Sequence, residues 1–192
     1  MSEVISHLGV CPKGQGDARR PARDAHGGSL LIQCVGNRLR RDDGAALVVA
    51  DRLRAGGLGS VVREYWGEGA ELMQAWEAVD RVLLVDAACS GATPGTLHRF
   101  DPLKGPPPRD FFYYSTHRFG VAEAVELAKV LGLLPPRMIL CAIEGGCFSA
   151  GDGLTEPVAL AAARLADEIL SDSLCPIGLG AGIVRHLENP GL

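Results

Sequence analysis

The chain has 192 residues, of which 47% are hydrophobic and 22% are charged, a composition that is ordinary for one soluble globular domain. Its formal net charge of −4 gives no electrostatic footprint for nucleic acid or for an anionic membrane, so we expect neither as a partner. The sequence has no uninterrupted apolar run of about 18 residues and its N-terminus lacks a signal-peptide pattern, which predicts a cytoplasmic protein.

The polarity of the chain changes near both ends. Residues 1–28 are rich in glycine and charge and have no apolar period, which predicts a mobile N-terminal extension. Residues 29–171 carry alternating strand and helix patterns and form one predicted α/β domain, and residues 172–192 are predicted to be a loosely ordered tail. No extended heptad pattern is present, so we expect a monomer.

The six cysteines lie far apart in the sequence and form no Cys-x-x-Cys pair, so the spacing of a zinc site is absent. Cys34 and Cys141 fall within apolar runs that are typical of strands, where a buried and inert thiol is expected. No cysteine is assigned a role.

Strand and helix patterns alternate along the central part of the chain. The edge strand after residue 95 is expected to be antiparallel, because no crossover helix precedes it. The alternation predicts a three-layer α/β sandwich with a mostly parallel sheet of about five strands flanked by helices. The predicted elements are strands at 30–35, 61–66, 82–86, 96–100 and 137–143, and helices from about 42 to 53, at 68–76, at 121–131 and from 155 to 169.

Two adjacent carboxylates, Asp42 and Asp43, stand where the first apolar strand gives way to the first helix. In open α/β sheets ligands bind beyond the carboxyl ends of the strands, so this turn is a candidate active-site floor. The alternative is that an Asp here caps the helix and complements its dipole. One cap suffices, however, and a second like charge beside it is a cost, which favours a chemical role for the pair.

Two further side chains are predicted near the same edge of the sheet. Asp86 closes the third apolar strand, and in a parallel sheet it lies at the same edge as Asp43. His117 precedes the helix at 121–131, where a cation would oppose the helix dipole, so we expect a neutral ring that can bind a metal. The alternative for His117 is a partly buried ring that is hydrogen-bonded to a backbone carbonyl.

Four motifs occur in the same order as in the hydrogenase maturation endopeptidases, which the chain resembles over residues 29–170. They are Gly36-Asn37-x-Leu39-x-x-Asp42-Asp43-Gly44, Val85-Asp86-Ala87, Pro94-Gly95-Thr96 and Ser115-Thr116-His117-x-x-Gly120. The resemblance implies a twisted five-stranded sheet and a cytoplasmic peptidase. Its substrate would be the nickel-loaded precursor of a [NiFe] hydrogenase large subunit, from which it removes a short C-terminal extension.

The resemblance also implies that Asp43, Asp86 and His117 are catalytic residues that bind the metal. Two carboxylates and one imidazole suit nickel or zinc and leave positions open for a substrate. In this family the nickel belongs to the substrate, and zinc or another divalent metal is an alternative in vitro.

Two routes of cleavage stay open. One uses a metal-polarised carbonyl or an activated water, and the other uses a carboxylate as general base, as in aspartic-type endopeptidases. In the second route Asp42 is the base, and its alternative role is to support Asp43 or to cap the helix. Glu144-Gly145 resembles the members of the family that serve soluble, NAD-linked hydrogenases.

A nucleotide-binding enzyme and a non-catalytic checkpoint chaperone are the two alternative functions. A nucleotide-binding enzyme would need a glycine-rich phosphate loop, but residues 36–44 match neither common pattern, and paired Asp residues would repel phosphate. A non-catalytic checkpoint chaperone would dock on the nickel site of the same subunit through the same ligands without cutting it.

Overall fold

The computed structural model describes residues 29–77, 79–105 and 119–171. The predicted extension at 1–28, the predicted tail at 172–192 and His117 therefore lie outside the described residues. The elements are β1 (Leu30–Val35), η1 (Arg41–Gly44), α1 (Ala45–Leu53), η2 (Arg54–Leu58), β2 (Val62–Tyr65), α2 (Gly69–Gln74), β3 (Arg81–Ala88), β4 (Leu97–Phe100), α3 (Val121–Leu131), β5 (Arg137–Glu144) and α4 (Glu156–Leu170).

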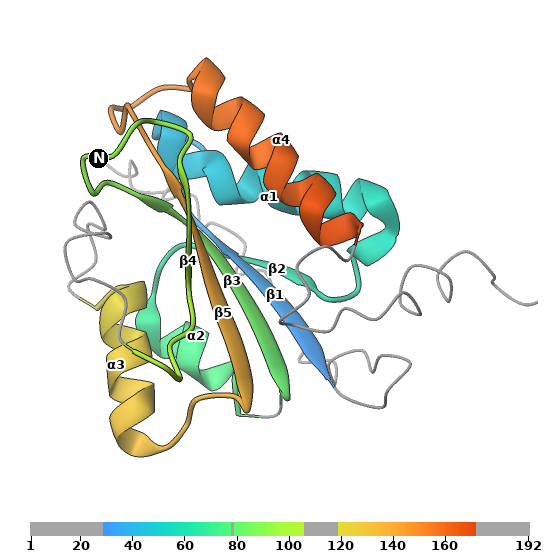
Figure 1. Cartoon of the computed structure of the whole chain (residues 1–192), viewed down its shortest axis with the longest axis vertical. Helices are drawn as coiled ribbons and strands as arrows, with labels where there is room; N and C mark the ends of the chain where they lie inside the picture. Colours follow the sequence, from blue (N-terminus) through green and yellow to red (C-terminus); the bar gives the residue numbers. More distant parts are fainter. Residues whose placement is uncertain (1–28, 78, 106–118, 172–192) are drawn as a thin grey trace, which may run out of the picture.

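The five strands form one sheet in the order β2-β1-β3-β5-β4 (Figure 1). The pairs β1–β2, β1–β3 and β3–β5 are parallel, and β4 runs antiparallel to β5 at the edge. The predicted fold class is confirmed, including the direction of the edge strand. A parallel core of this kind places the carboxyl ends of β1, β3 and β5 side by side at one edge.

Helices cover both faces of the sheet. In Figure 1, α1 and α4 lie on one face and α2 and α3 on the other. Two hydrophobic cores result, one of which joins α1 and α4 to the sheet while the other joins α2 and α3 to it. The central strand β3 is apolar on both faces because both are covered, as is usual for a parallel strand.

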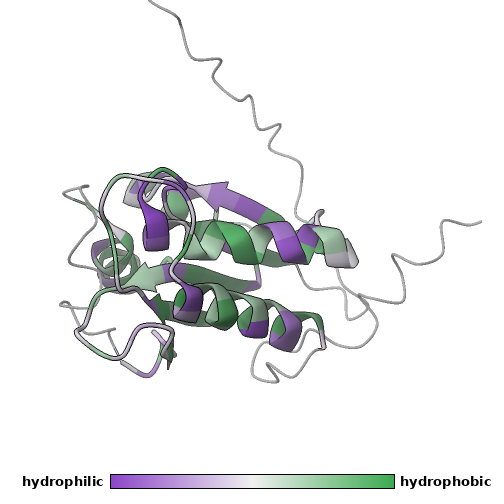
Figure 2. Ribbon diagram, turned by 90° about the horizontal axis from the view of Figure 1, so that it is seen from above, coloured by the Kyte–Doolittle hydropathy of each residue, from purple (hydrophilic) through white to green (hydrophobic). Residues whose placement is uncertain are grey.

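The helices bury the stripes that their apolar periods predict. In α4, Val158, Ala161, Ala162, Leu165 and Ile169 are buried. α3 ends at Leu131, and the next residue, Gly132, adopts the left-handed conformation at φ 69° that glycine allows without strain. Figure 2 shows the result, with hydrophobic and hydrophilic segments alternating along the helices.

The interior holds one polar pair that the sequence pattern did not predict. Gln33 interrupts the apolar run of β1 and is fully buried. Its Oε1 accepts a hydrogen bond from Trp76 Nε1 at 2.6 Å, and its Nε2 lies 3.5 Å from the Leu72 carbonyl. Both polar ends of the buried Gln33 amide therefore have a hydrogen-bond partner, and these bonds connect β1 with α2 and with the residues just after it.

Two boundaries differ from prediction at the functional edge. β3 continues through Ala88, so Asp86 lies inside the strand, because pairing with β5 extends to Ala88 opposite Glu144. α1 begins at Ala45 and not near Asp42, because the N–H groups of Arg41 and Asp42 donate to Gly151 and Cys147 of a distant loop.

Both strand cysteines are buried, as predicted, and burial raises the pKa of Cys34 and of Cys141 to about 12. Within the described part of the chain, no helix is long and apolar enough to cross a membrane.

Candidate active site

The candidate site lies at the carboxyl edge of the parallel strands, where three connections meet. The turn after β1 carries Asp42 and Asp43 in η1, and η1 packs against β3, which carries Asp86. The loop from β5 to α4, residues 145–155, runs beside η1 and hydrogen-bonds to it. Carboxylates from distant parts of the sequence are thus brought together.

The turn after β1 is closed by a contact that only glycine permits. The Asn37 N–H donates to the Asp43 carbonyl at 3.2 Å, so the chain folds back over seven residues. Gly36 has a φ of +155°, and a Cβ atom there would lie 2.0 Å from the Asp43 carbonyl oxygen. The position of Asp43 therefore depends on the missing side chain of Gly36.

We expect Gly36→Ala to lower the free energy of unfolding by about 3 kcal/mol, since a backbone atom would have to move and the conformation would be strained. Urea unfolding measures this. Gly105→Ala is the matched control, because its Cβ would meet nothing within 4 Å, and it should change stability little. A Gly36→Ala variant as stable as the control would contradict the geometry.

Asp42 is fully buried and does not cap the helix. Its Oδ2 accepts hydrogen bonds from Gly146 N and Cys147 N, both at 2.9 Å, and from Thr155 Oγ1 at 2.9 Å. Its Oδ1 accepts one from Thr155 N at 2.7 Å. Charge-assisted bonds of this kind are strong, so Asp42 fastens the β5–α4 loop to the turn that carries Asp43.

Asp43 is partly exposed and lies near the half-buried Asp86. Burial raises the pKa of Asp86 well above its usual range, the Ala87 N–H that donates to Oδ1 at 2.8 Å lowers it, and the Asp43 carboxylate raises it again. Two carboxylates that oppose each other's ionisation are a pair that a cation would stabilise. This arrangement therefore fits a divalent metal.

The third predicted ligand, His117, lies outside the described residues, so the structure does not place it. Within residues 29–77, 79–105 and 119–171, no group of three His, Cys, Asp or Glu side chains is arranged to hold a metal ion. The described residues thus include two of the three residues that the sequence predicts as ligands.

A second buried carboxylate, Glu144, fastens the loop that follows β3. Its Oε1 accepts hydrogen bonds from the N–H groups of Ser90, Gly91 and Ala92 at 2.7, 2.9 and 3.2 Å. Its Oε2 accepts one from Ser90 Oγ at 2.8 Å and lies 3.1 Å from His98 Nε2. The sequence singled out Glu144 only as a subtype marker, although a carboxylate at the end of a buried strand is a signal for such a role.

We expect Glu144→Ala to lower the free energy of unfolding by about 3 kcal/mol, because Glu144 is fully buried and three backbone N–H groups and the Ser90 hydroxyl lose their acceptor. Glu144→Gln should cost about 1 kcal/mol, since the amide oxygen can still accept from those groups. Denaturant unfolding of both variants measures the order. Equal losses of unfolding free energy in the two variants would contradict the role of Glu144 as an acceptor for these backbone N–H groups.

Comparison with known proteins supports one family. A family model described as HycI, hydrogenase maturation protease, matches residues 67–172, more than half of the chain. No curated protein sequence matches the chain.

Solved structures with the same fold come from the same kind of protein. The endopeptidase HycI from Escherichia coli superposes with a TM-score of 0.60 at 23% identity, over 75% of this chain and 90% of that one. The hydrogenase maturating endopeptidase HybD from E. coli gives 0.58 at 21% identity, over 74% and 90%. The [NiFe] hydrogenase maturation protease HybD from Thermococcus kodakarensis gives 0.56 at 25% identity, over 76% and 97%. From the family model and this shared fold, we conclude that the chain belongs to the hydrogenase maturation protease family and is a hydrogenase maturation endopeptidase.

Proposed function

We propose that this endopeptidase acts in the cytoplasm on the nickel-loaded precursor of a [NiFe] hydrogenase large subunit and removes a short C-terminal extension. Asp43, Asp86 and His117 engage the nickel that the precursor carries. Loaded precursor would then be cut in preference to empty precursor, because only loaded precursor completes the site.

One observation carries this proposal: Asp43 and Asp86 come from separate segments of the chain and lie close enough for the Asp43 carboxylate to raise the pKa of Asp86. Placing two carboxylates this close together costs free energy in the unbound protein. Unfavourable pairs of this kind are found mainly at functional sites. A divalent cation reverses the cost because it is attracted by both carboxylates. A neutral imidazole from His117 would add a nitrogen ligand that favours nickel or zinc over magnesium or calcium.

Asp42 serves in this proposal as a positioning residue and not as the general base. Its two oxygens already accept four hydrogen bonds, and its side chain is removed from solvent. A general base needs an oxygen within hydrogen-bond reach of the water that it deprotonates. We therefore favour metal-assisted cleavage, in which the nickel polarises the peptide carbonyl or activates water.

Intact-mass spectrometry tests the proposal. Nickel-loaded and nickel-free precursors of the large subunit are each incubated with the wild-type protein. We expect a C-terminal peptide to be lost from the loaded precursor only. Equal cleavage of both precursors would overturn the metal check, and binding of the loaded precursor with no loss of mass would indicate a checkpoint chaperone.

A further inference from the structure

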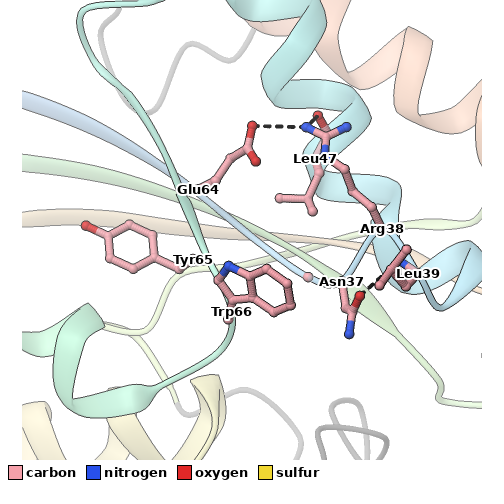
Figure 3. A pocket seen from close by; sticks show the side chains of 8 residues that line it. Asn37, Arg38, Leu39, Leu47, Glu64, Tyr65 and Trp66 are labelled. Carbon is pink, nitrogen blue, oxygen red and sulfur yellow. Dashed lines mark hydrogen bonds and ion pairs between the residues drawn. The ribbon is translucent and has the colours of Figure 1, made fainter. Parts of the chain in front are cut away.

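A hollow of about 130 Å³ opens beside the turn that carries Asp43 (Figure 3). Its volume exceeds that of a few water molecules and falls well below that of a pocket for a drug-sized ligand. One side chain of a partner protein would fill it. It is lined by Gly36, Asn37, Arg38, Leu39, Leu47, Glu64, Tyr65 and Trp66.

Apolar side chains gather around this hollow although they face solvent. The side chains of Trp66, just after β2, and Leu39, in the turn after β1, are 68% and 63% exposed. Leu47 of α1 also lines the hollow and is buried. Exposed tryptophan beside other apolar groups is typical of protein-binding sites, since tryptophan is enriched among residues that dominate binding energy.

The charged residues that line the hollow are already paired. Arg38 Nη2 lies 3.0 Å from Glu64 Oε1, and Arg38 Nη1 lies 2.7 Å from Asp51 Oδ2. The dashed line that starts at Glu64 in Figure 3 marks its pair with Arg38. With these charges compensated, the hollow favours an apolar occupant over a charged one.

The hollow adjoins the turn that carries Asp43. Gly36 and Asn37 line it, and the same Asn37 donates its N–H to the Asp43 carbonyl. The hollow and Asp43 are therefore parts of one short turn, so a polypeptide bound at Asp43 has the hollow as a neighbouring surface.

We propose that this hollow is a specificity subsite that binds one apolar side chain of the hydrogenase precursor, of leucine to phenylalanine size, close in sequence to the bond that is cut. The inference rests on the proposed function, because it takes the precursor as the substrate. Trp66 and Leu39 contribute binding and do not touch the reacting atoms.

Cleavage kinetics with nickel-loaded precursor give the first test. We expect Trp66→Ala and Leu39→Ala each to raise KM by about tenfold, as for the loss of a buried apolar contact. The kcat value should change by less than about twofold, because such a contact is the same in ground and transition states. Leu160→Ala is the matched control, because Leu160 is an equally exposed leucine, 65% exposed, that lies on α4 and does not line the hollow. The KM of this variant should equal that of the wild type.

Fluorine NMR tests binding without reference to cleavage. The chain contains two tryptophans, so labelling with 5-fluorotryptophan gives two signals. Trp76 is 2% exposed and hydrogen-bonded to Gln33, which makes it an internal reference. We expect unlabelled loaded precursor to shift or broaden the Trp66 signal, assigned with Trp66→Phe, and to leave the Trp76 signal in place.

The outcomes separate this inference from the proposed function. Cleavage by the wild type with an unchanged KM in both variants and an unchanged Trp66 signal would overturn the subsite and leave the peptidase intact. A perturbed Trp66 signal without cleavage would support the subsite and contradict the peptidase. Absence of both binding and cleavage by the wild type would overturn the proposed function and the subsite with it.

Discussion

Asp43→Asn should abolish processing of the nickel-loaded precursor while the protein stays folded. An amide is a poor ligand for nickel compared with a carboxylate. Loss of a residue that only hydrogen-bonds to a metal ligand typically lowers metal affinity or activity ten- to a hundredfold, and loss of a ligand itself should lower activity more. We therefore expect cleavage to fall by at least about a hundredfold. The rate is followed by intact-mass spectrometry at a fixed precursor concentration.

The Asp43→Asn variant should lose activity without losing stability. Asp43 and Asp86 oppose each other's ionisation, so removal of the Asp43 charge takes away a repulsion. The midpoint of thermal unfolding of the metal-free variant should therefore stay close to that of the wild type. Asp152→Asn, an exposed carboxylate in the β5–α4 loop, serves as the control and should keep full activity. Full processing by folded Asp43→Asn would remove Asp43 from the site.

Asp42→Asn should lose stability and keep part of its activity, which is the opposite of the result expected for Asp43→Asn. An amide NH2 in place of one oxygen would face backbone N–H groups that now donate to the carboxylate, so donors around this fully buried side chain would be left without acceptors. We expect the free energy of unfolding to fall by about 3 kcal/mol, as for other broken buried charge networks. Urea unfolding beside Asp152→Asn measures it.

The catalytic consequence of Asp42→Asn should be indirect. The folded fraction of this variant should keep measurable cleavage, because Asp42 holds the loop and Asp43 without acting as the base. A stable Asp42→Asn protein that is fully inactive would instead identify Asp42 as the base.

The core of the sheet could be predicted from the sequence because its three central strands are largely buried on both faces. Such strands appear as short apolar runs, and β1, β3 and β5 all do. The short connection before β4 predicted its antiparallel direction, which the structure confirms. Because parallel strands share one carboxyl edge, the approach of Asp43 to Asp86 also followed from topology.

The different roles of Asp42 and Asp43 could not be predicted in this way. Both are aspartates at the same turn, and they are distinguished only by the loop from Gly146 to Thr155, more than a hundred residues later in the chain. The same holds for Glu144, whose partners in the 90–92 loop depend on the pairing of β3 with β5. Side-chain contacts of this range depend on tertiary structure and leave no local pattern.

Some predictions stay predictions. His117 as the third ligand, the nickel, the service to an NAD-linked hydrogenase and the monomeric state rest on the sequence. The hollow beside Trp66 arose only from the structure, since an aromatic residue at the end of a strand has no periodicity that distinguishes an exposed position from a buried one.

The most direct test is a cycle of four binding measurements. Wild type and Asp43→Asn are each mixed with nickel-loaded and nickel-free precursor, and dissociation constants are taken from stopped-flow association and dissociation rates before cleavage begins. We predict that nickel tightens binding to the wild type by at least about tenfold and does not tighten binding to Asp43→Asn, which gives a coupling between the metal and that carboxylate. The same preference for nickel in both proteins would contradict the account.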